Sequence, residues 1–228
     1  VCIARHRLSP YVFLALNAQL PEKLEELLMN VSEAITARRA IKWYDPDHLM
    51  PEETFLELME HAILAPTAFN IQNWRFLRVR DPGQRKAIRA VAWDHAQVTD
   101  ASELLVLCLD TKAWSREPES YWRNAPQEVQ DFLVPAIAQY YEGKPQVERD
   151  EGMRSCGLAG MAIMLMAKEL GYDSCPMDGF DYEAVADIVK LPPDYEIAFM
   201  IAIGKGTKAA WPKPGQLALD DVVFEDRF

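Results

Sequence analysis

Two runs of apolar residues indicate a sheet that is buried on both faces. Residues 104–109 are all apolar. In the run over residues 196–203, every residue after Glu196 is apolar too. A strand covered on both faces needs no alternation of apolar and polar positions. Residues 75–80 alternate enough to predict a third strand. The chain is therefore expected to fold as a sheet between layers of helices.

Apolar residues at helical spacing predict the helices around this sheet. Ser32 and Glu33 suit the start of one helix. Pro51 and the acidic residues after it suit the start of another, because proline fits the first turn and the helix dipole favours acids there. Pro66 ends that helix, so residues 67–72 are expected in a loop. The expected helices cover residues 20–29, 31–37, 51–63, 82–91, 126–142 and 151–170.

The helix expected over residues 151–170 is apolar on nearly every face, which indicates burial on all sides. A second copy of the chain could cover it, with Gly157 and Gly160 allowing close helix contact. The alternative is a central helix within a monomer. The tail after Trp211 is expected to be extended, with residues 222–224 forming a short strand on a neighbouring subunit's sheet.

Residues 112–150 are rich in aromatic, proline and charged residues and predict an excursion over the surface. The aromatic rings in this region could either cover a bound ligand or pack against one another. These rings belong to Trp114, Tyr121, Trp122 and Phe132.

The composition fits one large domain with a core of its own. Half of the 228 residues are hydrophobic, and residues 31–228 are expected to form a single domain behind an N-terminal arm or helix over residues 1–30. A signal peptide is an alternative for the arm, but its apolar stretch is short and interrupted. The net charge of −11 argues against nucleic acid or an anionic membrane as partner.

The sequence carries no common metal or disulfide motif, and its one dinucleotide-like motif stands in the wrong context. The four cysteines form no C-x-x-C pair, and the four histidines are isolated from one another. We therefore expect reduced thiols, no bound metal and a cytoplasmic protein. Residues 204–209 match G-x-G-x-x-A, but that fingerprint must open a helix, and Pro212 and Pro214 follow instead.

Three short segments carry groups that together suit FMN. Residues 38–42 hold fixed positive charge, residues 65–74 hold side-chain amides, and residues 175–181 hold a glycine turn whose backbone can approach a flat ring. FMN needs all three, because it combines a dianionic phosphate with a flat ring and a hydrogen-bonding pyrimidine edge. Taken singly, they would be a solvated helix end, loop polar residues and a turn in which glycine tolerates positive φ.

The order and spacing of these segments resemble the FMN-dependent nitroreductase family from about residue 33 onward. That family carries an R-R-S-x-R-like start, an A-P-S-x-x-N-x-Q-x-W segment and a late P-x-x-G-F loop. This chain departs from the pattern at Ala40, where serine is common, and at Gly215, where a second basic residue is common. The resemblance implies FMN contacts from Arg38, Arg39, Ala40, Lys42, Pro66, Thr67, Ala68, Asn70, Gln72, Pro176, Met177, Asp178, Gly179 and Lys213.

The resemblance also implies a role for each segment. Arg38, Arg39 and Lys213 would bind the phosphate and ribityl chain. Lys42 would support negative charge near flavin N1 and O2, and Asn70 would read the pyrimidine edge. Backbone N–H groups within the loop of Pro176, Met177, Asp178 and Gly179 would face N5 and O4, although Pro176 itself has no N–H. No side chain is expected as a catalytic acid or base, because the chemistry takes place at N5 and water can supply protons.

The implied fold is α+β, a three-layer α/β/α arrangement with a mostly antiparallel central sheet flanked by helices. Its C-terminal tail would reach the partner subunit of a homodimer that holds FMN at the interface. The implied activity is ping-pong transfer of two electrons from NAD(P)H to a nitroaromatic or quinone-type acceptor. Two alternatives stay open: other redox chemistry on the same fold, such as dehalogenation or oxidation, and a protein that binds FMN without turnover.

Overall fold

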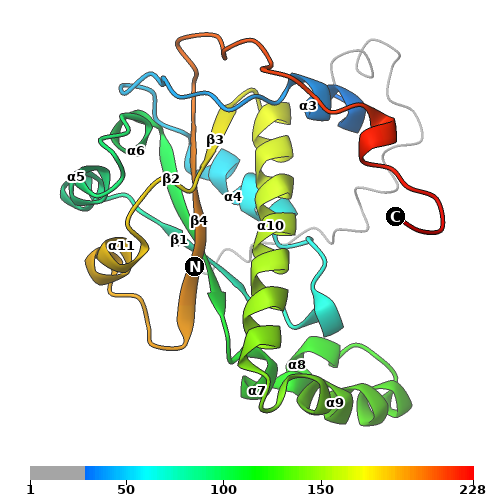
Figure 1. Ribbon diagram of the computed structural model, residues 1–228. Coiled ribbons are helices and arrows are strands. Elements are labelled where there is room, and N and C mark those ends of the chain that lie inside the picture. Colours follow the sequence, from blue (N-terminus) through cyan, green and yellow to red (C-terminus); the bar gives the residue numbers. More distant parts are fainter. Residues whose placement is uncertain (1–28) are drawn as a thin grey trace, which may run out of the picture.

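The computed structural model describes residues 29–228, and its centre is a four-stranded sheet (Figure 1). In spatial order the strands are β1 (Trp74–Arg78), β2 (Glu103–Asp110), β4 (Tyr195–Gly204) and β3 (Asp173–Met177). All neighbouring strands are antiparallel. The three predicted strands are confirmed with small shifts of their ends, whereas β3 was not predicted as a strand.

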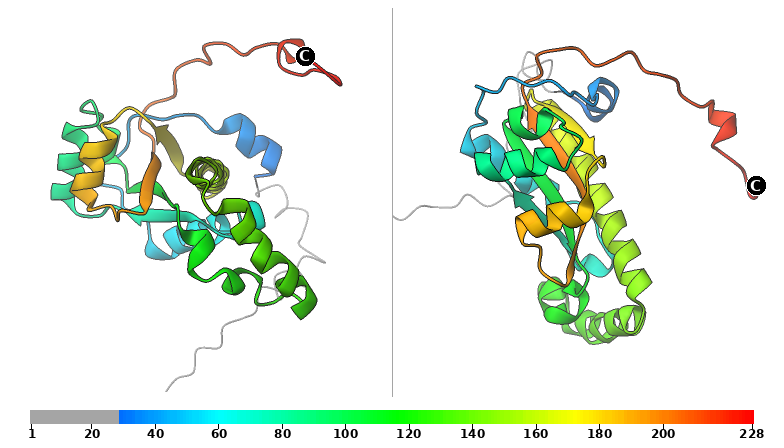
Figure 2. Two further views of the ribbon diagram at one scale, coloured as in Figure 1. Left: turned by 60° about the horizontal axis from the view of Figure 1, so that its bottom comes forward. Right: turned by 60° about the vertical axis from the view of Figure 1, so that its left-hand side comes forward.

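Helices cover both faces of the sheet in the three layers that were expected (Figure 2). One face carries α4 (Glu52–Ala62) and α10 (Pro145–Glu169); the other carries α5 (Pro82–Ala90), α6 (Gln97–Asp100) and α11 (Tyr182–Val189). Leu105 and Leu107 of β2 join the first core and Leu104 and Val106 the second, because successive side chains on a strand point to opposite faces. Every residue of β2 is buried, which explains its unbroken apolar run.

The start of α3 (Val31–Ala37) corrects one prediction. Its cap is Asn30 rather than Ser32. The Asn30 side chain accepts a hydrogen bond from the N–H of Glu33 at 3.0 Å, and the Glu33 carboxylate accepts one from the N–H of Asn30 at 2.9 Å. This reciprocal pair satisfies two N–H groups that a helix start leaves without partners. The predicted arm over residues 1–30 and the helix over 20–29 lie outside the described residues, apart from their last positions.

The aromatic-rich excursion lies at the lower end of the molecule in Figure 1. It contains α7 (Ala113–Arg116), α8 (Pro118–Trp122) and α9 (Gln127–Tyr141). Its tryptophans and Tyr121 pack around a small core made by Ile71, Ile137 and Tyr141. Trp114, Tyr121 and Trp122 therefore pack within the chain, whereas Phe132 is 74 % exposed on α9.

The long helix α10 starts at Pro145, earlier than predicted, and is buried along one face only. A Cβ on Gly160 would lie within 3.0 Å of the Phe199 ring, so this glycine lets the helix approach the sheet closely. Gly157 has open space around it. The alternative of a central helix covered on all sides within a monomer is therefore wrong, whereas cover by a second copy of the chain stays a prediction. Three outward apolar side chains stay partly uncovered: Leu158, Met161 and Leu165.

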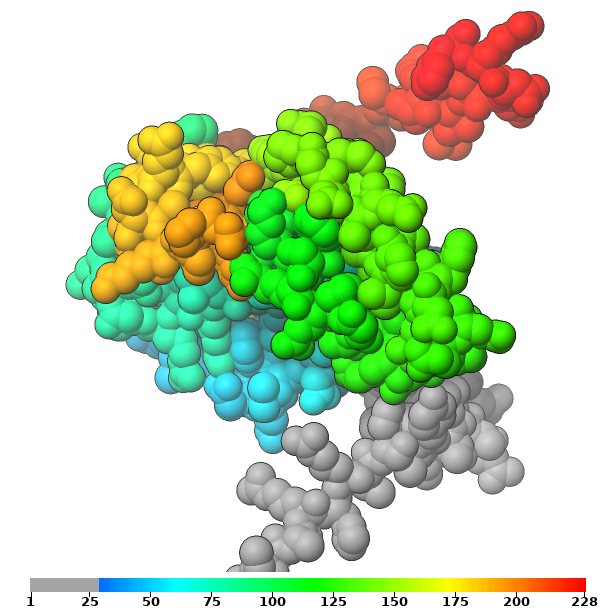
Figure 3. Space-filling model, turned by 90° about the horizontal axis from the view of Figure 1, so that it is seen from below, coloured from blue at the N-terminus to red at the C-terminus, as the bar shows by residue number. Residues whose placement is uncertain are grey.

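The tail stands away from the folded body (Figure 3). Residues 211–228 are all exposed, and they contain one short 3₁₀ turn, η2 (Leu219–Asp221). Residues 222–224 pair with no strand of the described chain, and their pairing with a neighbouring subunit's sheet stays a prediction. Several large apolar side chains therefore lie in solvent: Leu217, Leu219, Val222, Val223, Phe224 and Phe228. Within residues 29–228, no helix has the length and apolar character needed to cross a membrane.

Candidate functional site

The backbone brings residues 38–42 alongside the outer edge of β3. Ala40 forms a parallel bridge with Ser174, and the N–H of Ile41 donates to the Ser174 carbonyl at 3.1 Å. A cavity of about 550 Å³, here called the basic cavity, opens beside this edge. Residues predicted from three separate segments line it: Arg38, Arg39, Ala40, Lys42, Pro176 and Lys213. The early basic segment, β3 and the tail thus meet at one place.

The basic cavity concentrates positive charge in an acidic protein. Four of its lining residues are lysine or arginine and none is Asp or Glu, in a chain of net charge −11. The positive charge also acts on Cys175 of β3. Burial raises the pKa of the Cys175 thiol, and the positive charges of Lys42 and Arg38 oppose that rise. Several cationic groups around one cavity suit a phosphate group. Among residues 29–228, no cluster of His, Cys, Asp or Glu is arranged to hold a metal ion.

The tail closes the basic cavity through Trp211, which the sequence analysis did not single out as a site residue. Arg39 Nη2 donates to the Trp211 carbonyl at 2.5 Å, and Lys42 Nζ lies 5.3 Å from the centre of the Trp211 ring. Two cations that were expected to face the ligand therefore also hold the tail. The sequence did carry one signal for this role: Trp211 is a large aromatic residue in a proline-rich segment that forms no core in which to bury it.

The predicted glycine turn over residues 175–181 begins inside β3, which includes its first three residues, and only part of it faces outward. The Met177 side chain is buried in the core, so a ligand can reach only its backbone. Asp178 accepts a hydrogen bond from the Tyr182 hydroxyl, and burial together with this bond raises the pKa of Tyr182 to about 12. Gly179 lacks the positive φ that the sequence suggested. A Cβ there would lie 2.7 Å from the Trp93 ring, so close packing explains the glycine.

Trp93 gives this turn an exposed aromatic neighbour that the sequence analysis missed. The residue is 76 % exposed although its ring stands against Gly179. Trp93 and Asp94 both have positive φ, 49° and 53°. Two successive residues with side chains in this region are unfavourable and persist only where the surrounding structure holds them. No motif pointed to Trp93, because this strained turn contains no glycine.

The loop over residues 66–72 lies at the other end of the sheet, away from the basic cavity (Figure 1). Trp74, just after the loop, pairs with Leu109 near the C-terminal end of β2. Ser174, beside the basic cavity, pairs with Ile203 of β4, and Ile203 pairs with Glu103 at the N-terminal end of β2. The two places are therefore roughly 20 Å apart along the sheet. One chain does not bring the following predicted residues to its own basic cavity: Pro66, Thr67, Ala68, Asn70 and Gln72.

The 66–72 loop has a strained shape that its neighbours hold. Phe69, Asn70 and Gln72 have positive φ between 46° and 55°, although none is glycine. Asn70 Nδ2 donates to the Tyr121 carbonyl at 2.9 Å, and the N–H of Gln72 donates to Thr67 Oγ1 at 3.0 Å. The exposed Asn70 side chain keeps its Oδ1 without a hydrogen bond from the described chain. The loop can therefore offer a polar group to a ligand that approaches from outside.

Known proteins are similar to this chain in sequence and in fold. The profile of the nitroreductase family matches residues 35–205. Protein DrgA of Synechocystis sp. is 52% identical over 196 residues, covering 84% of this chain and 93% of DrgA. An NADH dehydrogenase of Thermus thermophilus is 32% identical over 200 residues, covering 86% of this chain and 96% of its own. The crystal structure of a nitroreductase-like protein of Exiguobacterium sibiricum was solved in complex with FMN. It superposes on this chain with a TM-score of 0.80 at 29% identity, and the match covers 86% of this chain and 96% of that one. The chain therefore belongs to the nitroreductase family, a family of oxidoreductases.

Proposed function

We propose that this chain is an FMN-dependent oxidoreductase that uses NAD(P)H to reduce nitroaromatic or quinone-type acceptors by ping-pong transfer of two electrons. The observation that carries the proposal is the basic cavity, where four cationic side chains meet beside the end of β3. The family relationship and the FMN in the Exiguobacterium sibiricum protein support it. FMN, when bound, supplies a ring nitrogen, N5, that accepts and donates hydride.

Each part of the basic cavity has a task in this proposal. Arg38, Arg39 and Lys213 bind the phosphate and ribityl chain, because several cationic donors are needed to replace the hydration of a dianion. Lys42 lies exposed at the same cavity and stabilises negative charge on the pyrimidine ring. Outside the lining of the basic cavity, in the turn after β3, the backbone N–H groups of residues 178–179 would hold the ring near N5. No side chain is assigned as general acid or base.

We also propose a homodimer in which each FMN site takes its second half from the partner subunit. Within one chain the basic cavity lacks the 66–72 loop. A two-fold axis can place each chain's loop against the other chain's cavity, because such a dimer uses the same surfaces twice. The partly uncovered apolar side chains of α10, together with Val31 and Ile35 of α3, give this contact an apolar surface. In this arrangement the exposed tail reaches the partner subunit.

The purified protein tests the cofactor and the reaction. We expect a flavin spectrum that NADH or NADPH bleaches without oxygen and that a quinone such as menadione, or a nitroaromatic, restores. A colourless protein that takes up no FMN would refute the cofactor. A bound flavin that neither nicotinamide bleaches would indicate FMN binding without turnover. Bleaching without recovery by either acceptor class would point to other redox chemistry.

Heterodimers test the shared site. Arg38→Ala damages the basic half and Asn70→Ala the loop half, so each homodimer is expected to lose FMN from both of its sites. A heterodimer of one Arg38→Ala chain and one Asn70→Ala chain keeps one intact site, because its two undamaged halves face each other. Isolated with two different affinity tags, it is expected to hold about half of the wild-type FMN. Absence of any recovery would refute the shared site.

A further inference from the structure

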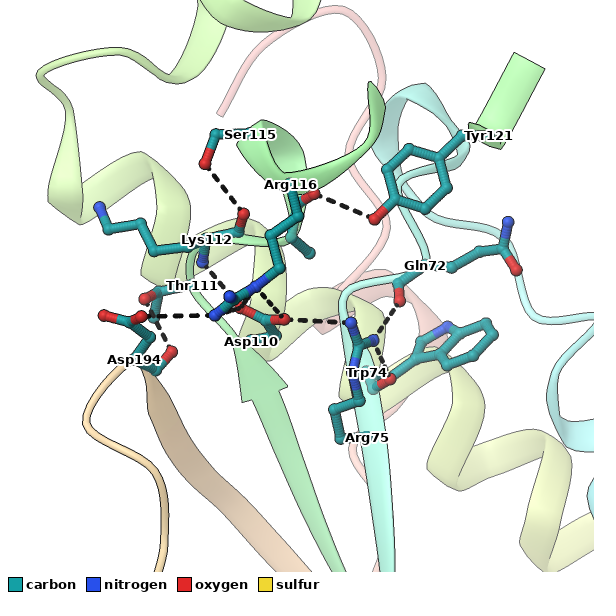
Figure 4. Close-up of polar contacts among 11 residues, drawn as sticks. Gln72, Trp74, Arg75, Asp110, Thr111, Lys112, Ser115, Arg116, Tyr121 and Asp194 are labelled. Carbon is teal, nitrogen blue, oxygen red and sulfur yellow. Dashed lines mark hydrogen bonds and ion pairs between the residues drawn. The ribbon is translucent and has the colours of Figure 1, made fainter. Parts of the chain in front are cut away.

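Asp110, the last residue of β2, is a buried carboxylate to which the proposed function gives no task (Figure 4). Its side chain is 1 % exposed. It accepts hydrogen bonds from Arg75 Nη2 at 3.1 Å, from Arg116 Nε at 3.1 Å and from the N–H of Lys112 at 3.0 Å. A buried carboxylate is stable only with such partners. Two guanidinium groups from different elements therefore meet on one acid.

Arg75 connects Asp110 to the 66–72 loop. While Nη2 bonds Asp110, Nη1 donates to the Gln72 carbonyl at 2.8 Å and to the Trp74 carbonyl at 2.9 Å. The planar guanidinium therefore fixes the last residue of the loop relative to β2. In Figure 4 the Gln72 carbonyl points at Arg75, whereas its side-chain amide points away from the cluster.

Arg116 connects the same acid to the excursion. It ends α7, and α7 is tied to α8 because the Tyr121 hydroxyl donates to the Ala113 carbonyl at 3.0 Å. From α8, the Tyr121 carbonyl accepts the bond from Asn70 Nδ2 at 2.9 Å. A closed path therefore runs from Asp110 through α7 and α8 to Asn70, and back along the loop to the arginine of β1.

We propose that Asp110 is a positioning residue for the 66–72 loop, because it holds both ends of the path that fixes Asn70 and Gln72. The inference rests on the proposed function, in which the loop completes the partner subunit's FMN site. The loop needs such support because Phe69, Asn70 and Gln72 have positive φ without being glycine, so their shape is imposed from outside. A loop that is already held in its binding shape binds more tightly, since the ligand need not order it.

Asp110→Asn tests the inference with almost no change of volume. The variant removes the negative charge and presents an NH₂ group to two guanidinium groups, so at least one arginine loses its partner. Charged hydrogen bonds are the strong ones, and we expect the Kd for FMN to rise about 10- to 100-fold. Fluorescence titration of the apoprotein with FMN measures this change.

Glu148→Gln is the matched control. Glu148 is also a buried acid, with a side chain 5 % exposed, and it accepts bonds from Lys112 Nζ at 2.7 Å and Trp114 Nε1 at 2.9 Å. It has no hydrogen bond to Arg75 or to the 66–72 loop. Its loss perturbs the same end of the molecule without opening the path through Asp110. We therefore expect the Kd for FMN to stay within about threefold of the wild-type value.

Heterodimers separate positioning from a general loss of stability. Paired with an Arg38→Ala chain, an Asp110→Asn chain is expected to recover one FMN site, because its own basic half is intact. Paired with an Asn70→Ala chain it is expected to recover none, because both loop halves are then damaged. A chain that is merely unstable would fail with both partners. Wild-type FMN affinity in the Asp110→Asn homodimer, failure with Arg38→Ala or recovery with Asn70→Ala would overturn the inference.

The same experiment tells failure of the inference from failure of the proposed function. If the Arg38→Ala and Asn70→Ala chains do not complement each other, the shared site itself is wrong. If they do and Asp110→Asn binds FMN normally, only the inference is wrong. If Asp110→Asn does not fold, the FMN affinity of the Arg75→Lys variant tests the inference instead. Lysine keeps a charge for Asp110 but lacks the second arm to the Gln72 carbonyl, so weaker FMN binding supports the inference and wild-type affinity overturns it.

Discussion

Two glycines on α10 allow a quantitative test of how this helix packs on the sheet. A Cβ added at Gly160 would lie 3.0 Å from Phe199 Cε2 and 3.4 Å from Leu107 Cδ2. Carbon atoms prefer separations of about 3.5–4.0 Å, so the Phe199 ring or the helix must move. At Gly157, three residues earlier in the same helix, nothing lies within 4 Å of an added Cβ.

Gly160→Ala and Gly157→Ala are expected to differ in their effect on stability. Both variants gain about 1 kcal/mol, because alanine is the better residue in a helix interior. Only Gly160→Ala also suffers overpacking, which costs about 1–3 kcal/mol. Gly157→Ala should therefore be more stable than the wild type, and Gly160→Ala should be equal to it or less stable by up to about 2 kcal/mol. Within one chain, the difference between them is the overpacking cost alone.

Thermal or urea unfolding followed by circular dichroism measures this difference. For a chain of this size, 1 kcal/mol shifts Tm by about 2–4 °C, so the two variants should melt about 2–12 °C apart. Adding Phe199→Leu to Gly160→Ala should recover part of the loss, because the ring is what the new methyl group meets. Two protein concentrations are needed, since Gly157 faces the surface assigned to the dimer. Equal stability of the two variants would refute the packing described for α10.

Two further predictions concern single side chains. Lys42→Ala is expected to weaken FMN binding on the order of tenfold, because a charge pair near the surface is worth about 1–4 kcal/mol. Titration of the apoprotein measures it, with the exposed Lys86→Ala on α5 as control; unchanged affinity and unchanged reduction rate would remove this role. Burial raises the pKa of Cys108 and Cys156 to about 12, so about one thiol in 10,000 is ionised at pH 8. DTNB should label neither in the folded protein, and rapid modification of either, located by mass spectrometry, would contradict their burial.

The layers of the fold were predictable because they depend on the side chains of each element. Unbroken apolar runs identified β2 and β4. β3 was missed because it is short, mixes polar with apolar residues and contains Pro176, which argues against a central strand. Proline is tolerated there because β3 is the edge of the sheet. What covers the outer face of α10 was not predictable, because an apolar surface does not reveal whether its own chain or another one covers it.

The candidate site was predictable in its chemistry and only partly in its location. The basic residues at 38–42, Pro176 and Lys213 reach one cavity. The placement of the 66–72 loop depends on strand order and direction, which its local sequence does not carry. Asp110 follows an apolar run, and no motif marked it. Its arginine partners lie 35 and 6 residues away, at spacings that match no periodic pattern.

The exposed tail makes the colour of a preparation depend on how it is handled. Chain that lies wholly in solvent is where proteases cut first. Trypsin cleaves poorly before proline, which protects the bond after Lys213, but Lys208 is exposed and alanine follows it. A cut after Lys208 would remove Trp211 and Lys213 on one fragment and leave the folded body whole. If a sample turns pale on storage and its main gel band moves to a slightly lower apparent mass, the cause would then be a cleaved chain and not a low affinity of the intact chain for FMN.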